Sequence, residues 1–440
     1  MTTLKEDLGD VHPPRQFLAL ILAFSTTVPG IALKLSGGHI NHTVDALLFG
    51  AAIVGAAFLL SWAAEVAQLD ISAGLAIAVL ALIAVLPEYA VDFVFASQGG
   101  NAVEVYGAAC RPPGSTETSA CSLALANMTG ANRLLIGVGW SAVVFVAWYQ
   151  WRRKGIRRPE GIKLARQHSV EVAFLAAATI YSLTLPLKHS ITLVDSVILV
   201  GIFVVYTIRV SKAPAEEPHL VGPAREIGQF RTSRRRLSVI AMFLFSGAVI
   251  LICAEPFAHA LVETGKDLGV STFLLVQWVA PLASESPELL VAILFAWKLN
   301  TDAGLGTLVS SKVNQWTLLV GTLPIVFAVS AGAAHGLPIE PRQREELLLT
   351  AAQSFFALAV LVSLSISVRE AWMLFTLFWA QFILGAIVPE SLHGVERIGV
   401  SVAYLALGIF ILARNGRRIL PLLRDGFRVP YRHLRGDEEE

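Results

Sequence analysis

Two Pro-Glu pairs lie inside long apolar stretches of the sequence, Pro87-Glu88 and Pro287-Glu288. A carboxylate in the hydrocarbon of a bilayer is costly unless it is paired, protonated or bound to an ion, so it marks a candidate functional site. A proline inside a helix frees one carbonyl about one turn earlier. Carboxylate, hydroxyl and carbonyl oxygens together suit hard cations such as Ca²⁺ or Na⁺. The pairs therefore indicate a cation site, with a purely structural pair of glutamates as the alternative.

Two further acids accompany these pairs. Asp92 follows Glu88 by one turn on the same helix face, where it is a candidate for relaying protons or for capping the helix near the membrane surface. Glu285 precedes Glu288 by three residues, so these two carboxylates share a helix face. Both groups of acids concentrate negative charge within apolar segments.

Two cationic residues also stay inside apolar stretches, Arg133 and Lys312. We expect Lys312 to lie on a helix next to Glu285 and Glu288, close to both carboxylates. Its ammonium group would there neutralise one carboxylate and take the place of one bound cation. We expect Arg133 to do the same near Glu88. A third polar group is the stripe formed by His259 with acids four residues to either side, which is either structural or suited to proton transfer.

The composition indicates that these charged residues lie within a membrane protein. Of the 440 residues, 55% are hydrophobic and 15% are charged, whereas soluble domains carry roughly 25% charged residues. The mean hydropathy is +0.64, and apolar runs recur at the length of about 20 residues that crosses a bilayer. The chain is therefore a polytopic membrane protein, which excludes a soluble enzyme, a coiled coil and a disordered chain.

The hydropathy pattern predicts an all-α fold with about twelve transmembrane helices, because within the bilayer every backbone polar group needs an internal partner. The predicted spans are 17–34, 45–68, 73–96, 122–148, 171–187, 191–208, 238–260, 271–296, 303–331, 347–365, 371–389 and 396–413.

Three basic segments, 150–168, 209–236 and 414–440, hold 21 of the 34 Lys and Arg residues. Such segments beside membrane spans mark the cytoplasmic face, and twelve crossings place both termini on that same face. We therefore expect an integral protein of a bacterial plasma membrane with cytoplasmic termini. A nucleic-acid or partner-binding patch is the poorer interpretation, and Arg342 and Arg344 fall on the outer side against this rule.

The same pattern divides the chain into five segments. They are an N-terminal tail with an extra helix (1–40), a first repeat (41–208), a cytoplasmic linker (209–236), a second repeat (237–390), and an extra helix with a basic cytoplasmic tail (391–440). Cys110 and Cys121 flank a Pro/Gly/Ser/Thr-rich stretch on the expected outer side, where oxidising conditions permit a disulfide between them.

The two repeats are visible in the sequence. LPEYAVDFVFAS around Glu88 aligns with SPELLVAILFAW around Glu288 at an offset of 200, and ANMTGAN (126–132) aligns with GTLVSSK (306–312) at an offset of 180. Because the predicted topology sends the two Pro-Glu helices across the membrane in opposite directions, the repeats are inverted. Inverted repeats are typical of secondary transporters with a substrate site near the midplane. Chance similarity of apolar helices is the alternative.

These motifs resemble those of the Ca²⁺/cation antiporter superfamily, the sodium/calcium exchangers and their prokaryotic relatives, whose repeats read roughly GTS-x-PE and GN-x-x-GSN-x-x-N. Here the second repeat reads ASESPE (283–288) and GTLVSSKVNQ (306–315), and the first reads AVLPE (84–88) and ANMTGANRLL (126–135). The resemblance is good over 45–140 and 238–325. It implies a ten-helix exchanger core of two inverted halves, to which the first and last spans are additions.

The resemblance places the paired acids of the family on Glu88 and Glu288. It places a hydroxyl ligand on Ser284, where the first half has Ala84, and Glu285 stands where a serine is usual, opposite Val85.

On the next helix, the serine of the GSN motif falls on Ser311 and is Ala131 in the first half. The asparagine of that motif is kept as Asn132 but is replaced by Lys312 in the second half. The last polar ligand falls on Gln315 in the second half.

The sequence thus favours a secondary active cation antiporter that exchanges Ca²⁺ or Na⁺ against Na⁺ or H⁺. Glu88, Glu288 and Ser311 would form its ion cage at the midplane between the repeats. The tethered charge of Lys312 implies fewer ion sites than a multi-ion exchanger has, and makes proton coupling plausible. Its expected partners are inorganic cations and the lipid bilayer, without nucleic acid, and we expect no cofactor and no enzymatic activity. A transport-inactive homologue acting as a sensor or scaffold and a membrane-embedded enzyme are the alternatives, and the oligomeric state stays open.

Overall fold

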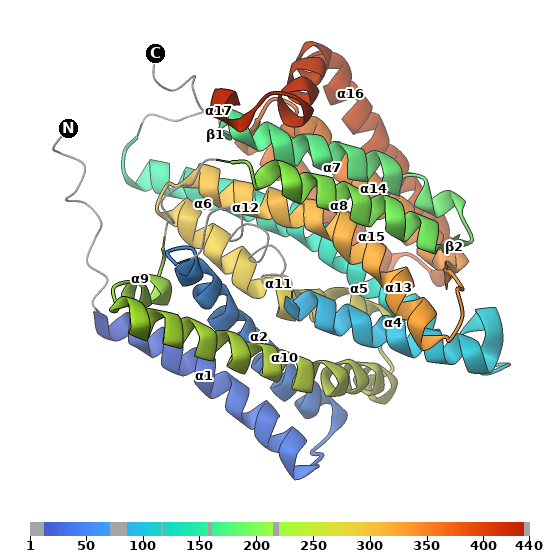
Figure 1. Cartoon of the computed structure of the whole chain (residues 1–440). Coiled ribbons are helices and arrows are strands. Elements are labelled where there is room, and N and C mark those ends of the chain that lie inside the picture. Colours follow the sequence, from blue (N-terminus) through green and yellow to red (C-terminus); the bar gives the residue numbers. More distant parts are fainter. Residues whose placement is uncertain (1–12, 71–85, 116–117, 157–160, 214–219, 435–440) are drawn as a thin grey trace.

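The computed structural model describes residues 13–70, 86–115, 118–156, 161–213 and 220–434. Its helices lie side by side in one elongated bundle (Figure 1). The long helices in the first half are α1 (Pro13–Ser36), α2 (His42–Ala67), α4 (Leu86–Tyr106), α5 (Ala120–Leu134), α6 (Ser141–Arg153), α7 (Ser169–Ser182) and α8 (Leu193–Val210). Those in the second half are α10 (Thr232–Leu268), α11 (Thr272–Trp297), α12 (Thr301–Asn314), α13 (Val320–Ser330), α14 (Pro341–Leu361), α15 (Val368–Ile387) and α16 (His393–Phe427).

The fold is helical, as the sequence predicts. Within the described ranges, nine helical segments are long and apolar enough to cross a membrane. Three other helices, α4, α14 and α15, are 20 or 21 residues long, so the long segments of that part of the chain amount to twelve. The N-terminal half of the predicted span 73–96, with Ala84 and Val85, lies outside the described residues. How many helices cross the bilayer stays a prediction.

Several helices extend beyond the predicted spans. The span expected at 347–365 begins earlier, because Pro341 occupies the first turn of α14, a position that suits its fixed φ angle and missing N–H. The span expected at 396–413 is the apolar part of the much longer α16, which continues through a basic stretch to Phe427. The helix α10 begins at Thr232, inside the expected linker, which also contains the short helix α9 (Pro223–Gly228).

Two structural features recur in both halves of the chain. The helices α5 and α6 join through a π-helical turn at Leu135–Trp140, and α12 and α13 join through one at Gln315–Leu319, so the turns begin 180 residues apart. The strand β1 (Gly161–Lys163) pairs antiparallel with β4 (Ser365–Ser367), and β2 (Ser190–Ile191) pairs with β3 (Leu337–Pro338). Each pair therefore joins one half of the chain to the other. These features support the predicted repeat, whose inversion in the membrane stays a prediction.

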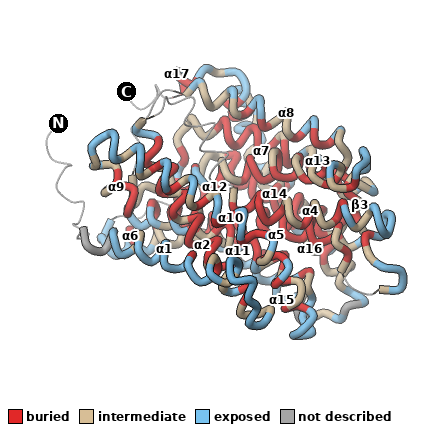
Figure 2. The backbone as a smooth tube through the Cα atoms, turned by 60° about the horizontal axis from the view of Figure 1, so that its bottom comes forward, coloured by how far each residue is buried: buried red, intermediate tan, exposed pale blue. Residues whose placement is uncertain are grey.

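The buried centre of the bundle lies around α5, α11 and α14, whereas α1 is largely exposed (Figure 2). Exposed Leu and Ile side chains, such as Leu244 on α10, suit contact with lipid. The helices α5 and α11 approach closely at Gly130, where an added Cβ would lie 1.7 Å from the Gln277 carbonyl oxygen. A glycine at this position is therefore required for the two helices to meet.

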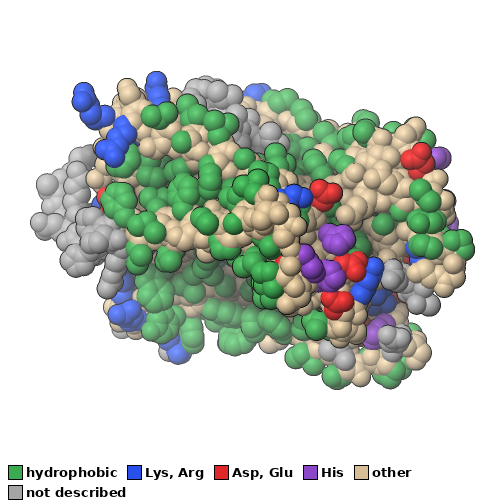
Figure 3. Space-filling view, turned by 90° about the horizontal axis from the view of Figure 1, so that it is seen from below, with side chains coloured by type: hydrophobic (Ala, Val, Ile, Leu, Met, Phe, Trp, Pro, Cys, Tyr) green, Lys and Arg blue, Asp and Glu red, His purple; other side chains and the backbone are tan. Residues whose placement is uncertain are grey.

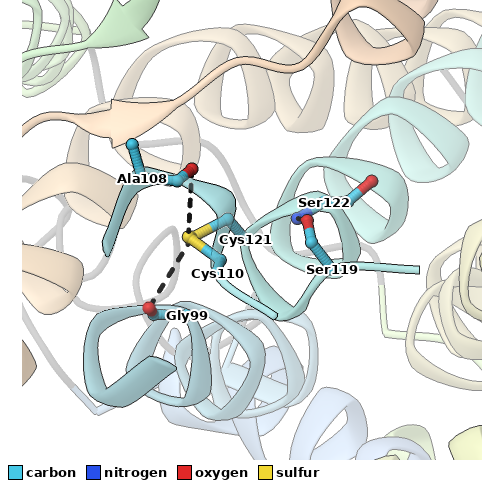
Figure 4. The surroundings of a disulfide bond; sticks show 6 residues. All are labelled: Gly99, Ala108, Cys110, Ser119, Cys121 and Ser122. Carbon is cyan, nitrogen blue, oxygen red and sulfur yellow. Dashed lines mark hydrogen bonds between the residues drawn. A yellow bond between two sulfur atoms is a disulfide. The ribbon is translucent and has the colours of Figure 1, made fainter. Parts of the chain in front are cut away.

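Cys110 and Cys121 are joined by a disulfide in the structure (Figure 4). The bond links the segment after α4 to the first turn of α5, and the two Cα atoms are 5.8 Å apart. Gly99 of α4 lies against Cys121, since an added Cβ there would be 3.3 Å from the Cys121 Cα. The disulfide thus ties the end of α4 to α5.

We predict that the double variant Cys110→Ser/Cys121→Ser melts at a lower temperature than the wild type. Closing a loop of this size stabilises the folded state by about 3 kcal/mol in the chain-entropy account. Thermal melting of the purified protein in detergent, with and without reductant, measures the effect. Reductant should lower the melting temperature of the wild type and leave that of the variant unchanged; equal melting temperatures in all four samples would contradict the prediction.

Candidate functional site

The acids singled out in the sequence come together from two helices. Glu88 lies on α4, two residues after the described range resumes at Leu86, and Glu285 and Glu288 lie in the middle of α11. The Glu88 carboxylate interacts electrostatically with those of Glu285, Glu288 and Asp92, and with the Lys312 ammonium group. Glu88, Asp92 and Glu285 are buried. The structure therefore concentrates four carboxylates and one ammonium group in the interior.

One oxygen on each of two carboxylates is held by a neighbouring amide. Asn127 Nδ2 donates to Asp92 Oδ1 over 2.7 Å, and Gln315 Nε2 donates to Glu285 Oε1 over 2.6 Å. These hydrogen bonds orient the carboxylates. Ser284 behaves differently, because its hydroxyl donates to carbonyl oxygens of its own helix, those of Ala280 at 3.2 Å and Pro281 at 3.3 Å.

Six oxygens of the cluster are buried without a hydrogen bond of ordinary geometry among the described residues, although the Ser311 hydroxyl interacts with the Glu288 carboxylate. They are Glu88 Oε1, Asp92 Oδ2, Glu285 Oε2, Glu288 Oε2, Ser311 Oγ and Gln315 Oε1. Buried polar atoms nearly always have partners, so this group of six is unusual. All six are oxygen atoms, the ligand type that Ca²⁺ takes. In the part of the chain that the structure describes, however, no three His, Cys, Asp or Glu residues already converge on one metal position.

Lys312 lies beside the acids without touching them. Its Nζ donates to Asn132 O at 2.5 Å and to Asn132 Oδ1 at 2.6 Å, and stands 5.4 Å from the centre of the Trp316 ring. The ammonium group interacts electrostatically with Glu285 and Glu88. No ion pair within 4.0 Å joins it to Glu288 or to any other carboxylate in the described ranges. The expected closeness to Glu285 is therefore electrostatic rather than a direct contact.

Asn132 and Lys312 are equivalent positions of the predicted repeat, 180 residues apart, and they bond to each other. The Asn132 side chain bonds on both sides of its amide, since its Nδ2 also donates to Met128 O at 2.9 Å. In this arrangement both Asn132 oxygens accept from the lysine.

The expectation that Arg133 lies against Glu88 was wrong. Its Nη1 donates to Glu346 Oε2 at 2.8 Å, its Nη2 bonds to Gln381, and its guanidinium lies 5.0 Å from the centre of the Trp278 ring. The reason is helical geometry. Successive side chains on a helix diverge by about 100°, so while Asn132 faces α12, Arg133 faces α14 and α15.

Sequence reasoning missed the acid that pairs with Arg133. Glu346 also accepts from Gln277 Nε2 of α11 at 3.0 Å, and its Oε1 is 3.7 Å from Arg397 Nη1 of α16. It lies one residue before the predicted span 347–365, because it precedes the apolar run of its helix. The Pro at position 341 was the available signal, since proline marks a first helical turn and places Glu346 inside the helix.

Comparison with known proteins also indicates a cation exchanger. A family model described as "Sodium/calcium exchanger protein" matches residues 43–212 and 238–388. The crystal structure of the H⁺/Ca²⁺ exchanger CAX superimposes with a TM-score of 0.84 at 40% sequence identity, covering 94% of this chain and 98% of that chain. Native YfkE shares the fold at 13% identity, with a TM-score of 0.57 and coverage of 88% of this chain and 100% of that one. A comparison with curated proteins found no match.

We predict that Arg133→Met strongly destabilises the protein, because it removes the nearest cation from the buried Glu346 carboxylate. Breaking a buried pair in this way typically costs about 3–5 kcal/mol. The double variant Arg133→Met/Glu346→Gln removes both charges and should recover much of the loss. Melting temperatures of the three proteins in one detergent measure this, and a single variant as stable as the wild type would contradict it.

Proposed function

This chain belongs to the sodium/calcium exchanger protein family, and from this premise we propose that it exchanges Ca²⁺ for H⁺ across a membrane. The observation that carries the proposal is the set of buried oxygens around Glu88, Glu285 and Glu288 that have no hydrogen-bond partner in the part of the chain that the structure describes. The similarity to a structure named an H⁺/Ca²⁺ exchanger favours Ca²⁺ and H⁺ over Na⁺ among the ions considered. The family consists of integral membrane transporters, so the chain lies in a membrane. We further propose that this is a bacterial plasma membrane and that both termini are cytoplasmic.

The acids would bind Ca²⁺ and H⁺ in alternation. Several carboxylates gathered in an apolar interior require neutralisation by a cation or by protons, and one carboxylate oxygen cannot hold both at once. Glu88, Glu285 and Glu288 would supply the charge, and Ser311 and Gln315 would supply neutral oxygens. Asp92 would hold a proton beside Glu88. Because no three acidic ligands converge in the described residues, Ca²⁺ would draw them together on binding.

Lys312 would act as a tethered cation. Held by two Asn132 oxygens, its ammonium group would offset one negative charge of Glu88 or Glu285 without moving across the membrane. Four carboxylates alone would need four positive charges from bound Ca²⁺ or protons. Because Lys312 supplies one of them permanently, the site would take up one positive charge fewer from solution in each cycle. This part of the proposal rests on the electrostatic coupling of Lys312 to both acids.

The alternation of access would follow from the helix packing. The helices α4, α5, α11 and α12 surround the acids and contact one another, so they would form a fixed core. The helices α2 and α10 pack closely together beside that core, and would rock against it to open one side at a time. A transport-inactive sensor is less well supported, because the acids on both α4 and α11 are present.

We predict that the purified protein in liposomes takes up ⁴⁵Ca²⁺ when a pH gradient is imposed, and that Glu88→Gln or Glu288→Gln abolishes this uptake. Each substitution removes a charge that must alternate between ion and proton while keeping the side-chain volume. The matched control is Glu104→Gln, an exposed acid near the end of α4, which should transport normally. Absence of any Ca²⁺ or proton flux under either gradient would contradict an antiporter, and uptake driven by Na⁺ instead would contradict the choice of coupling ion.

We also predict that Lys312→Asn changes the number of charges moved per Ca²⁺, because the site loses its tethered cation and must take up one more from solution. The reversal potential of Ca²⁺ flux in liposomes at a set pH gradient measures this stoichiometry. Lys312→Arg, which retains the charge, is the control. Unchanged Ca²⁺ affinity and stoichiometry in Lys312→Asn would show that the ammonium group has no such role.

A further inference from the structure

Three histidines gather at one end of the bundle, away from the buried acids. His39 lies in the connection between α1 and α2, His42 is the first residue of α2, and His259 lies on α10. All three line a depression of about 580 Å³ together with Asp45 and other side chains. The face that carries α1, α2 and α10 shows histidine and acidic side chains close together (Figure 3).

Two of these histidines are held by carboxylates on one ring nitrogen. His39 Nδ1 lies 2.7 Å from Asp45 Oδ2, and His42 Nδ1 lies 2.6 Å from Asp267 Oδ2. A carboxylate at Nδ1 favours the proton on that nitrogen and leaves the lone pair on Nε2. Histidines that bind metals generally have this arrangement, in which a carboxylate sets the tautomer and the ring orientation.

The spacing of the rings also suits a shared ion. A metal about 2.0–2.1 Å from a ring nitrogen stands about 3.2 Å from the ring centre, so two rings on one tetrahedral metal, with a ligand angle of about 110°, have centres about 5.2 Å apart. The centres of His39 and His42 are 4.8 Å apart, and those of His42 and His259 are 6.4 Å apart. The first distance is close to the tetrahedral spacing, and His259 would have to approach His42 by about 1 Å to share a metal with it.

From this geometry we propose that His39, His42 and His259 form a binding site for a transition-metal ion such as Zn²⁺. Imidazole suits Zn²⁺, Cu²⁺ and Ni²⁺, whereas Ca²⁺ prefers carboxylate and carbonyl oxygens. No three His, Cys, Asp or Glu side chains of the described ranges already converge on a metal, so metal binding requires a rotation of the rings, of which those of His39 and His259 are exposed and that of His42 is half-buried.

The site is separate from the buried acids. Gln98 of α4 also lines the depression and follows Glu88 by ten residues, which corresponds to about 15 Å along a helix. A bound ion would join the α1–α2 connection to α10. His42 belongs to α2 and His259 to α10, and these two helices pack extensively against each other.

Zn²⁺ titration of the purified full chain by isothermal calorimetry at neutral pH tests the proposal. We expect one site that is weakened about tenfold or more by His42→Gln or by His39→Gln, and weakened to a smaller extent by Asp267→Asn. The control is His335→Gln in the exposed connection after α13, which should bind Zn²⁺ like the wild type. Melting temperatures verify that each variant is folded.

Glu88→Gln and Glu288→Gln separate this site from the proposed transport site, because both should retain it. Zn²⁺ affinity that is unchanged in His39→Gln/His42→Gln, or that is lost only in the glutamate variants, would overturn the proposal. The absorption spectrum of Co²⁺ added to the wild type gives a reading that needs no variant. Intense visible bands are expected from imidazole ligands in a tetrahedral site, and weak bands typical of six oxygens would overturn the proposal.

Discussion

Buried charge is the constraint on which the rest of this structure depends. A charged side chain in an apolar interior is tolerated only when partners or a bound ion offset its desolvation. Arg133 is offset by Glu346, and Lys312 by two oxygens of Asn132. Each partner comes from a different helix, so α5, α12 and α14 have to lie together for any of these charges to be buried. Gly130 of α5 has no side chain, so α11 can pack directly against α5 and help to bury these charges.

The buried acids of α4 and α11 differ from these satisfied cations. Among the described residues, Asp92 and Glu285 each have one oxygen held by an amide and one without a partner, and Glu88 and Glu288 each have one buried oxygen without a hydrogen bond. A protein that needed these charges only for stability would be expected to satisfy them. The contrast separates two kinds of buried charge in one bundle: those fully bonded, which hold helices together, and those left open, which suit an exchanged cation.

Much of this could be predicted from local patterns. The Pro-Glu pairs, the offset of 180 residues between the halves and the pairing of Cys110 with Cys121 each depend on spacing alone, and the helical fold follows from hydropathy. The neighbour of Arg133 could not be predicted in this way. Adjacent residues such as Asn132 and Arg133 point in directions that differ by about 100°, so their partners depend on which helix lies on which side. Glu346 was missed for a related reason, because it is buried by contacts with other helices rather than by an apolar segment of its own.

The sequence by itself determined that the chain is a helical membrane protein with acids inside its apolar segments, and which residue types are available for cation chemistry. These properties follow from composition and from the cost of charge in a bilayer, neither of which depends on how the helices are arranged. Only the tertiary structure decided which of those charges are satisfied. It uses Arg133 and Asn132 in helix contacts and leaves the oxygens of the glutamates open. The physical reason is that hydrogen bonds and ion pairs act over a few ångströms, between residues that the chain places as many as 248 positions apart.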